Sequence, residues 1–179
     1  MRKLKLEELG RESVEAFKAK EKVPIVLVMD NVRSALNVGS AFRTADGFAL
    51  EKIYLLGISA KPPHREIQKT AIGATESVEW VYYEEMEPLL EDLEDDAFEI
   101  IPVEQAENST QLQEFTPQKG AKYALIFGNE VNGVSQKFMD KASTCLEVPQ
   151  FGTKHSFNVS VCIGIVLWDF WSKLSLKIN

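Results

Sequence analysis

Short runs of apolar residues alternate along most of the chain with stretches of mixed polarity. Several runs are apolar at successive positions, a pattern typical of strands buried on both faces of a sheet. The expected strands cover residues 23–29, 52–58, 78–83, 98–103, 123–127 and 145–148. The stretches between them predict helices at 37–47, 64–71, 85–94, 109–115, 135–142 and about 157–174. This alternation predicts an α/β fold with a mostly parallel sheet and helices on both faces.

The beginning of the chain has a different pattern. Its apolar residues are scattered among charges at imperfect helical spacing, which predicts a helical extension over residues 1–22 and one domain over 23–179. A stretch charged throughout is not a secretory signal, and no apolar run is long enough to span a bilayer. The expected location is the cytoplasm, without a membrane partner.

The last expected helix contains "NVSVCIGIVLWDFW", which is apolar on nearly every side. A surface helix of a monomer needs a polar face. One side can pack on the sheet, and a second copy of the chain is the simplest cover for the other. The alternative is a helix buried within one large core.

The net charge of -7 argues against a nucleic-acid partner, but its distribution weakens that objection. Residues 84–107 hold eleven acidic residues and no Lys or Arg, which predicts one solvated acidic face. The remainder has 20 basic and 27 - 11 = 16 acidic residues, a balance of +4 that is compatible with a phosphate backbone. Two cysteines and two histidines without metal or redox spacing predict neither a zinc site nor a disulfide framework.

The loop "GNEVNGVS" at 128–135 comes close to a phosphate-binding P-loop. Gly128, Gly133 and Ser135 stand where that motif requires them, but Val134 replaces its Lys. Glu130 adds a negative charge that would repel a polyphosphate. ATP and GTP are therefore rejected as ligands, and a neutral or cationic ligand fits better. The alternative is that the glycines merely permit a tight turn.

Two more loops follow predicted strands, at the sheet edge where open α/β folds bind ligands. In "DNVRSALNVGSAFRTADGF" (30–48), Arg33 and Arg43 flank a short helix for which Asn37 is the expected N-cap. Arginines beside a helix N-terminus suit an anion. These residues are equally explained as caps and surface charges. In "VPQFGTKHSFNVSV" (148–161), Ser156 or Asn158 opens the last helix, and Ser156 is most simply its N-cap.

Together and in this order, the three loops resemble the SpoU (TrmH-like) RNA ribose methyltransferases, a branch of the SPOUT class. "NVRSALNVGSAFRT" (31–44) is similar to the family's first motif, with Ser34 in place of an Asn. "GNEVNGVS" matches the second, and "PQFGTKHSFNVSV" (149–161) the third, with Phe157 in place of a Leu. The stretch at 69–80 also looks like one common in the family. The resemblance covers roughly residues 23–173.

The resemblance implies an α/β domain whose C-terminal part is tied in a deep trefoil knot, and a homodimer packed partly through the last helix. It implies that S-adenosylmethionine binds within the knot, bordered by Gly128, Val148 and Phe157, and by Val103 at the end of an earlier strand. No metal is implied.

The implied reaction is methyl transfer to a ribose 2′-hydroxyl of tRNA or rRNA. The family pattern assigns activation of the hydroxyl to Arg43, with Asn37, Glu130, Ser156 and Asn158 orienting it, the cofactor and the ribose. A guanidinium stays protonated, so holding a phosphate and stabilising alkoxide charge is the more defensible role. Glu130 is expected to pair with an arginine.

The motifs do not identify the target RNA. A small compact enzyme with only a short leading helix favours tRNA over rRNA as the expected substrate. Arg33, Arg65, Lys69 and Lys154 are expected to contact RNA, or are ordinary surface charges. Two alternatives remain: an RNA-binding module that has lost catalysis, and a methyltransferase that acts on a base nitrogen.

Overall fold

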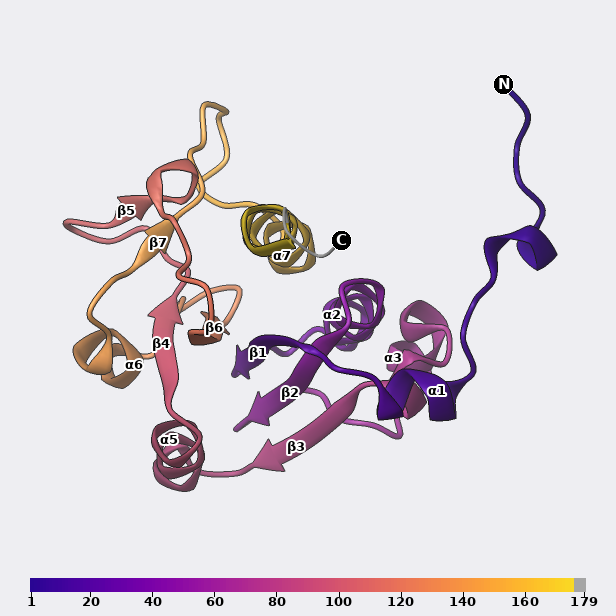
Figure 1. The fold of residues 1–179 in the computed structure, drawn as a ribbon. Coiled ribbons are helices and arrows are strands. Elements are labelled where there is room, and N and C mark those ends of the chain that lie inside the picture. The colour runs from indigo at the N-terminus through magenta and orange to yellow at the C-terminus, as the bar shows by residue number, and fades with distance from the viewer. Residues whose placement is uncertain (176–179) are drawn as a thin grey trace.

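A computed structural model describes residues 1–175 and places one five-stranded sheet at the centre of the domain (Figure 1). The strands lie in the order β3-β2-β1-β6-β4, and every neighbouring pair is parallel, which confirms the predicted sheet. Their bounds are Val23–Asp30 for β1, Leu50–Leu56 for β2, Glu79–Tyr83 for β3, Phe98–Pro102 for β4 and Lys122–Phe127 for β6. Two short strands, β5 (Thr110–Gln111) and β7 (Leu146–Glu147), form a second parallel pair.

The helices fall between the strands, as the polarity pattern predicts. They are α1 (Val14–Ala19), α2 (Ala35–Gly47), α3 (Arg65–Ala71), α4 (Ala74–Ser77), α5 (Met86–Asp95), α6 (Gln136–Lys141) and α7 (Val159–Ser175). The helix expected at 109–115 is wrong. That segment is β5 followed by a 3-10 turn, η2 (Leu112–Glu114), because pairing with β7 competes successfully with local helix formation. Within residues 1–175, none of these helices has the length and apolarity needed to cross a bilayer.

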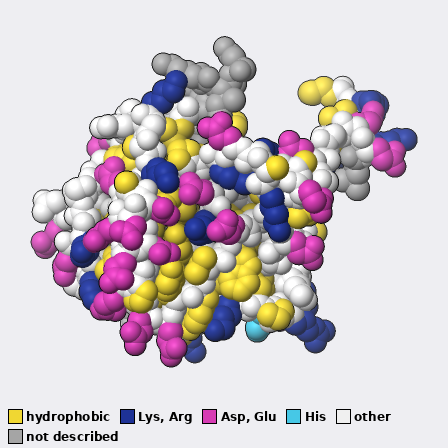
Figure 2. Space-filling model, turned by 60° about the horizontal axis from the view of Figure 1, so that its bottom comes forward, with side chains coloured by type: hydrophobic (Ala, Val, Ile, Leu, Met, Phe, Trp, Pro, Cys, Tyr) yellow, Lys and Arg dark blue, Asp and Glu magenta, His cyan; other side chains and the backbone are white. Residues whose placement is uncertain are grey.

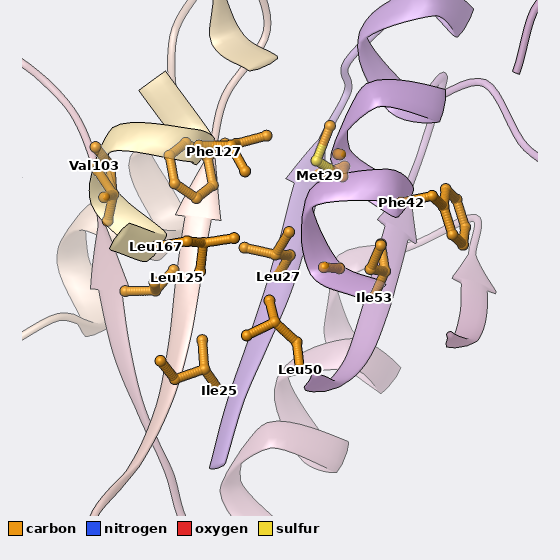
Figure 3. Close-up of a cluster of buried hydrophobic side chains, with 14 of the residues drawn as sticks. Ile25, Leu27, Met29, Phe42, Leu50, Ile53, Val103, Leu125, Phe127 and Leu167 are labelled. Carbon is orange, nitrogen blue, oxygen red and sulfur yellow. The ribbon is translucent and has the colours of Figure 1, made fainter. Parts of the chain in front are cut away.

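The sheet has a separate hydrophobic core on each face. Ile25, Leu27 and Met29 of β1 point to the face covered by α2 and α7 (Figure 3). Val26 and Val28, the residues between them, point to the face covered by α5 and α6. Successive residues therefore alternate between two apolar layers, which explains the uninterrupted apolar run in the sequence.

Helix α7 buries one side and exposes another. Ile163, Val166 and Phe170 are fully buried against the sheet, whereas Val161 is 51% and Trp168 is 58% exposed. The alternative of a helix buried on all sides within one core is therefore wrong. An apolar side remains uncovered in the single chain.

The N-terminal extension is less helical than expected. It consists of a 3-10 turn, η1 (Leu6–Leu9), and the short α1, and its first residues run away from the domain (Figure 1). Phe17 of α1 is 8% exposed and belongs to the core beside α2 and α7, so the extension is attached through this side chain.

Most acidic side chains of residues 84–107 are exposed, as expected, whereas Asp92 and Glu104 are partly buried. The carboxylates of Glu87 and Glu94 on α5 form ion pairs with Lys137 and Lys141 of α6. Figure 2 shows the acidic side chains on this side of the molecule with basic ones interspersed. Exposed pairs of this kind contribute little stability, but they balance part of the local charge.

Candidate active site

Loops that follow four strands meet at the carboxyl edge of the sheet. The loops after β4, β6 and β7, with the start of α7, enclose a space of about 580 Å³, here called the loop cavity. The loop after β1 lies beside them and bonds to Glu130 of the cavity lining. The loop cavity is lined by residues 103–105, 127–131, 133, 147–148, 150, 155–159 and 162. A volume of this size suits a ligand as large as a nucleoside derivative.

The four residues predicted to border the cofactor, Val103, Gly128, Val148 and Phe157, all line the loop cavity. Val103 and Val148 are each 9% exposed, and Phe157 is 40% exposed at the rim. Their contact with a cofactor stays a prediction. Within residues 1–175, no three His, Cys, Asp or Glu side chains converge as metal ligands would.

Four backbone N–H groups of the loop 128–135 bond within the loop itself. The N–H groups of Asn129 and Gly133 bond to each other's carbonyl oxygens at 3.0 and 2.9 Å. The Asn129 side-chain oxygen accepts from the N–H groups of Val131 at 2.9 Å and Asn132 at 3.1 Å. A P-loop must leave such donors free for phosphates. The side chain of Val134, at the position of the missing Lys, is buried in the core.

Two carboxylates from the ends of neighbouring strands bind the backbone at the end of this loop. Asp30, fully buried at the end of β1, accepts a hydrogen bond from the Ser135 N–H at 2.7 Å. Glu104, just after β4, accepts from the N–H groups of Val134 at 3.0 Å and Gln105 at 2.9 Å. The loop is thus held to both neighbouring strands.

A chain of side-chain hydrogen bonds crosses the mouth of the cavity. The Asn158 amide donates to the Asn37 Oδ1, and the Asn37 Nδ2 donates to Glu130, each at 3.2 Å. Glu130 also accepts from the backbone N–H groups of Arg33 and Ser34, both at 3.3 Å. Partial burial by itself would raise the pKa of the Glu130 carboxyl, but these donors and its own N–H outweigh burial and lower the pKa. Glu130 therefore stays ionised near neutral pH.

This network corrects three local expectations. Ser34, rather than Asn37, is the N-cap of α2, because its Oγ accepts the Asn37 N–H at 3.3 Å. Asn158, rather than Ser156, caps α7, since its side-chain oxygen accepts the Ser160 N–H at 3.0 Å. The expected pairing of Glu130 with an arginine side chain does not occur within the described part of the chain. Asn37 and the loop backbone bind its carboxylate instead.

Ser156 lines the loop cavity, but Arg43 does not. Arg43 is exposed on α2 and lines a second space of about 600 Å³, here called the N-terminal cavity. The extension also lines this cavity, including Arg11 and Lys20. Lys20 is paired with Glu12 at 2.7 Å. One chain therefore brings Asn37, Glu130, Ser156 and Asn158 together and leaves Arg43 apart.

The four side chains expected to contact RNA are all exposed, and they are spread over the surface. Arg33 follows β1 beside Glu130, and Lys154 lies in the loop before α7. Arg65 and Lys69 are one turn apart on α3, where Lys69 pairs with Glu66 at 3.4 Å. Contact with RNA stays a prediction for all four.

The sequence reasoning missed Asp30, Glu104 and Asn129, which hold the loops together. Asp30 had a usable signal, because a charge directly after a buried apolar strand needs a partner. Glu104 had none, since it is one of eleven acidic residues in residues 84–107. Its importance depends on long-range contacts with residues 133 and 134.

Comparison with known proteins assigns this chain to a family. A family model described as "SpoU rRNA Methylase family" matches residues 24–168. A protein of Staphylococcus saprophyticus named "Putative TrmH family tRNA/rRNA methyltransferase" is 26% identical over 156 residues. The alignment covers 87% of this chain and 61% of that protein. The chain thus spans about three fifths of the length of this curated relative.

Solved structures share the fold. An AdoMet-bound rRNA methyltransferase from Sinorhizobium meliloti aligns with a TM-score of 0.80 at 22% identity, covering 86% of this chain and 58% of that one. The A. aeolicus TrmH/SpoU tRNA modifying enzyme aligns with a TM-score of 0.76 at 22% identity, covering 89% and 79%.

Proposed function

Because the chain belongs to the SpoU rRNA Methylase family, we propose that it transfers a methyl group from S-adenosylmethionine to a ribose 2′-hydroxyl of RNA. The loop cavity is the observation that carries this proposal. Four N–H groups of the loop 128–135 bond within that loop. Among residues 1–175, the cavity lining includes carboxylates but no Lys or Arg. Such a cavity suits a cationic methyl donor and disfavours a polyphosphate.

The cofactor would be held mainly by the loop backbones. Gly128 lets the loop backbone pack closely on itself, because an added Cβ would collide with the backbone of Gly133 and Val134. Val103, Val148 and Phe157 would supply apolar walls for the adenosine part. The AdoMet-bound state of the Sinorhizobium meliloti protein, which shares the fold, supports this assignment.

When bound, the cofactor supplies a methyl group on a positively charged sulfur. The transfer would break the sulfur–carbon bond with its electron pair left on the sulfur, form an oxygen–carbon bond, and release the hydroxyl proton to solvent. The hydroxyl is a poor nucleophile, so its orientation supplies much of the rate. The network of Asn158, Asn37 and Glu130 is positioned to orient the ribose, with Ser156 beside it.

We propose that Arg43 binds an RNA phosphate and stabilises the developing alkoxide of a site completed by a second subunit. Arg43 lies outside the loop cavity of its own chain, and a neighbouring copy would bring the two together. The uncovered apolar side of α7, with Val161 and Trp168, supports a homodimer formed through this helix. Leu36 on the adjoining α2 is 44% exposed and would extend the same interface.

We also propose the deep trefoil knot that the family resemblance predicts. Strand β6 lies between β1 and β4, so the chain returns to the middle of the sheet after forming its edge. It then passes from α6 on one face to α7 on the other through the loop at 148–158. This course supports a threaded C-terminal part.

Incubation with cofactor labelled on its methyl group and with bulk tRNA and rRNA tests the function. We expect label in RNA, with tRNA slightly preferred, and after nuclease digestion we expect it on ribose. Label on a base would replace this proposal with base-nitrogen methylation. Binding of cofactor and RNA without any transfer would indicate an RNA-binding module without catalysis.

A further inference from the structure

The lining of the loop cavity is acidic. It includes the carboxylates of Glu104, Glu130 and Glu147, and no Lys or Arg of residues 1–175. Two of the three carboxylates are hydrogen-bonded to side chains. Glu130 bonds with Asn37 across the mouth, and Glu147 accepts the Ser109 hydroxyl at 2.7 Å.

Glu104 is placed differently, at the junction of the three loops. Its backbone N–H bonds to the Leu146 carbonyl of β7 at 2.9 Å, and its carboxylate bonds to the Val134 N–H. A Cβ added to Gly133 would collide with its Oε2, so the carboxylate lies directly against the glycine loop. It forms no ion pair within the described residues, and its two backbone donors leave lone pairs free.

The negative charge of Glu104 acts across the cavity. Cys162, on the α7 wall, has a thiol whose pKa is raised to about 11, first by burial and second by the charge of Glu104. Burial is also the main cause of the raised pKa of Cys145, where a hydrogen bond to the Glu104 backbone carbonyl lowers the pKa and the Glu104 charge raises it. A field that disfavours a thiolate favours a cation in the same space.

We propose that Glu104 makes the loop cavity selective for the positively charged methyl donor over its neutral thioether product. This inference rests on the proposed function. Methyl transfer removes the positive charge from the sulfur, and attraction to Glu104 ends in the same step. S-adenosylhomocysteine keeps every other group of the donor, so the carboxylate favours binding of substrate and release of product.

Calorimetric titration of three ligands tests the inference without catalysis. They are S-adenosylmethionine, S-adenosylhomocysteine and sinefungin, in which an amine-bearing carbon replaces the sulfonium. For Glu104→Gln we expect the affinity for the two cationic ligands to fall about tenfold, equivalent to about 1.4 kcal/mol. The affinity for S-adenosylhomocysteine should change less than about twofold, since an uncharged sulfur gains little from a carboxylate.

Two further variants separate charge from loop positioning. Glu104→Asp keeps the charge with a shorter reach, so it should retain the preference for cationic ligands even if all affinities fall together. Glu107→Gln removes an exposed charge from the same segment and should bind all three ligands as the unmodified chain does. Thermal unfolding of each variant confirms that it is folded.

Equal loss of affinity for all three ligands in Glu104→Gln would overturn the inference and leave Glu104 a loop-positioning residue. Equal affinity of the unmodified chain for donor and product would also overturn it. Binding of none of the three by the unmodified chain would instead overturn the proposed function, together with this inference.

Discussion

At the residue scale, the candidate site consists of groups whose polar atoms already have partners. Glu130 accepts hydrogen bonds from the backbone N–H groups of Arg33 and Ser34 and from the Asn37 side chain. The Asn37 side chain donates to Glu130 and accepts from Asn158. Asp30 and Glu104 fix the glycine loop from the two neighbouring strands. Under the proposed function, a site held in this way would orient a ribose and a cofactor without reorganising, and such orientation supplies much of the rate of a transfer.

Gly133 of this loop tolerates substitution poorly. Its φ is +68°, and an added Cβ would collide with the Glu104 carboxylate. We expect Gly133→Ala to lower the free energy of unfolding by about 1–3 kcal/mol, because strain and displacement of the carboxylate add together. Cofactor affinity should also fall.

Gly152→Ala is the matched control for that measurement. Gly152 lies in the loop before α7, and nothing lies within 4 Å of an added Cβ there. Denaturant unfolding and calorimetric titration would be run on both variants. A Gly133→Ala protein as stable as Gly152→Ala would show that Glu104 does not hold the loop as described.

Cys162 gives a test of cavity occupancy that does not depend on catalysis. Its pKa of about 11 predicts that roughly a thousandth of the thiol is ionised at pH 8, since each pH unit changes the ratio tenfold. We expect slow alkylation by iodoacetamide, with a rate rising about tenfold per pH unit from 8 to 10. S-adenosylmethionine should slow it further, because Cys162 lines the cavity.

Mass spectrometry on a Cys145→Ser variant would measure this rate for a single thiol. Denatured protein supplies the rate of a thiol with its ordinary pKa. Equal rates for native and denatured protein at pH 8 would contradict the burial and charge around Cys162.

At the element scale, the strands were predictable because their periodicity reports burial on two faces directly. Residues 23–29 are apolar at successive positions because β1 lies between two other strands and under helices on both sides. The segment 109–115 was mispredicted because its structure depends on β7, more than thirty residues later. The pattern at residues 31–44 predicted the helix but not its N-cap, because both Ser34 and Asn37 are residue types that cap helices. The Asn37 side chain bonds to Glu130 instead, and Ser34 is the cap.

The N-terminal extension is the element whose role the sequence left open. It lines the N-terminal cavity together with Arg43, and Arg11 is one of its lining residues. If RNA phosphates enter here, Arg11→Ala should raise the KM for RNA about threefold to tenfold, as expected for loss of one phosphate contact of 0.6–1.4 kcal/mol.

The affinity for S-adenosylmethionine should stay unchanged in Arg11→Ala, because Arg11 does not line the loop cavity. Lys18→Ala removes a charge from the same extension outside the N-terminal cavity and serves as the control. Steady-state kinetics at one fixed salt concentration would measure both variants. An unchanged KM in Arg11→Ala would exclude the extension from RNA binding at this position.

At the scale of the whole molecule, the separation of Arg43 from the loop cavity has one economical explanation. Each active site would combine the loop cavity of one subunit with Arg43 of the other. The apolar side of α7 provides a surface for that association, since Trp168 is 58% exposed and stacks on Trp171 at 5.6 Å. Motifs in one chain specify such residues without specifying which chain supplies them.

Mixed dimers would show whether Arg43 acts on the loop cavity of the other subunit or on that of its own chain. Arg43→Ala should bind S-adenosylmethionine normally and lose nearly all methyl transfer, because Arg43 lines the other cavity. A second variant, Gly128→Leu, should fail to bind cofactor, because a side chain there meets the loop backbone. In a mixed dimer, one site pairs the intact cavity of the first variant with the intact Arg43 of the second.

Unfolding and refolding equal amounts of the two variants together should therefore restore about one quarter of the unmodified activity, since half of the dimers are mixed and each has one complete site. Each variant refolded alone should stay inactive, and sedimentation should show dimers in every sample. Dimers without any recovered activity would mean that Arg43 acts within its own chain. The extension and α2 would then have to move relative to the loop cavity, because a single chain holds Arg43 outside it.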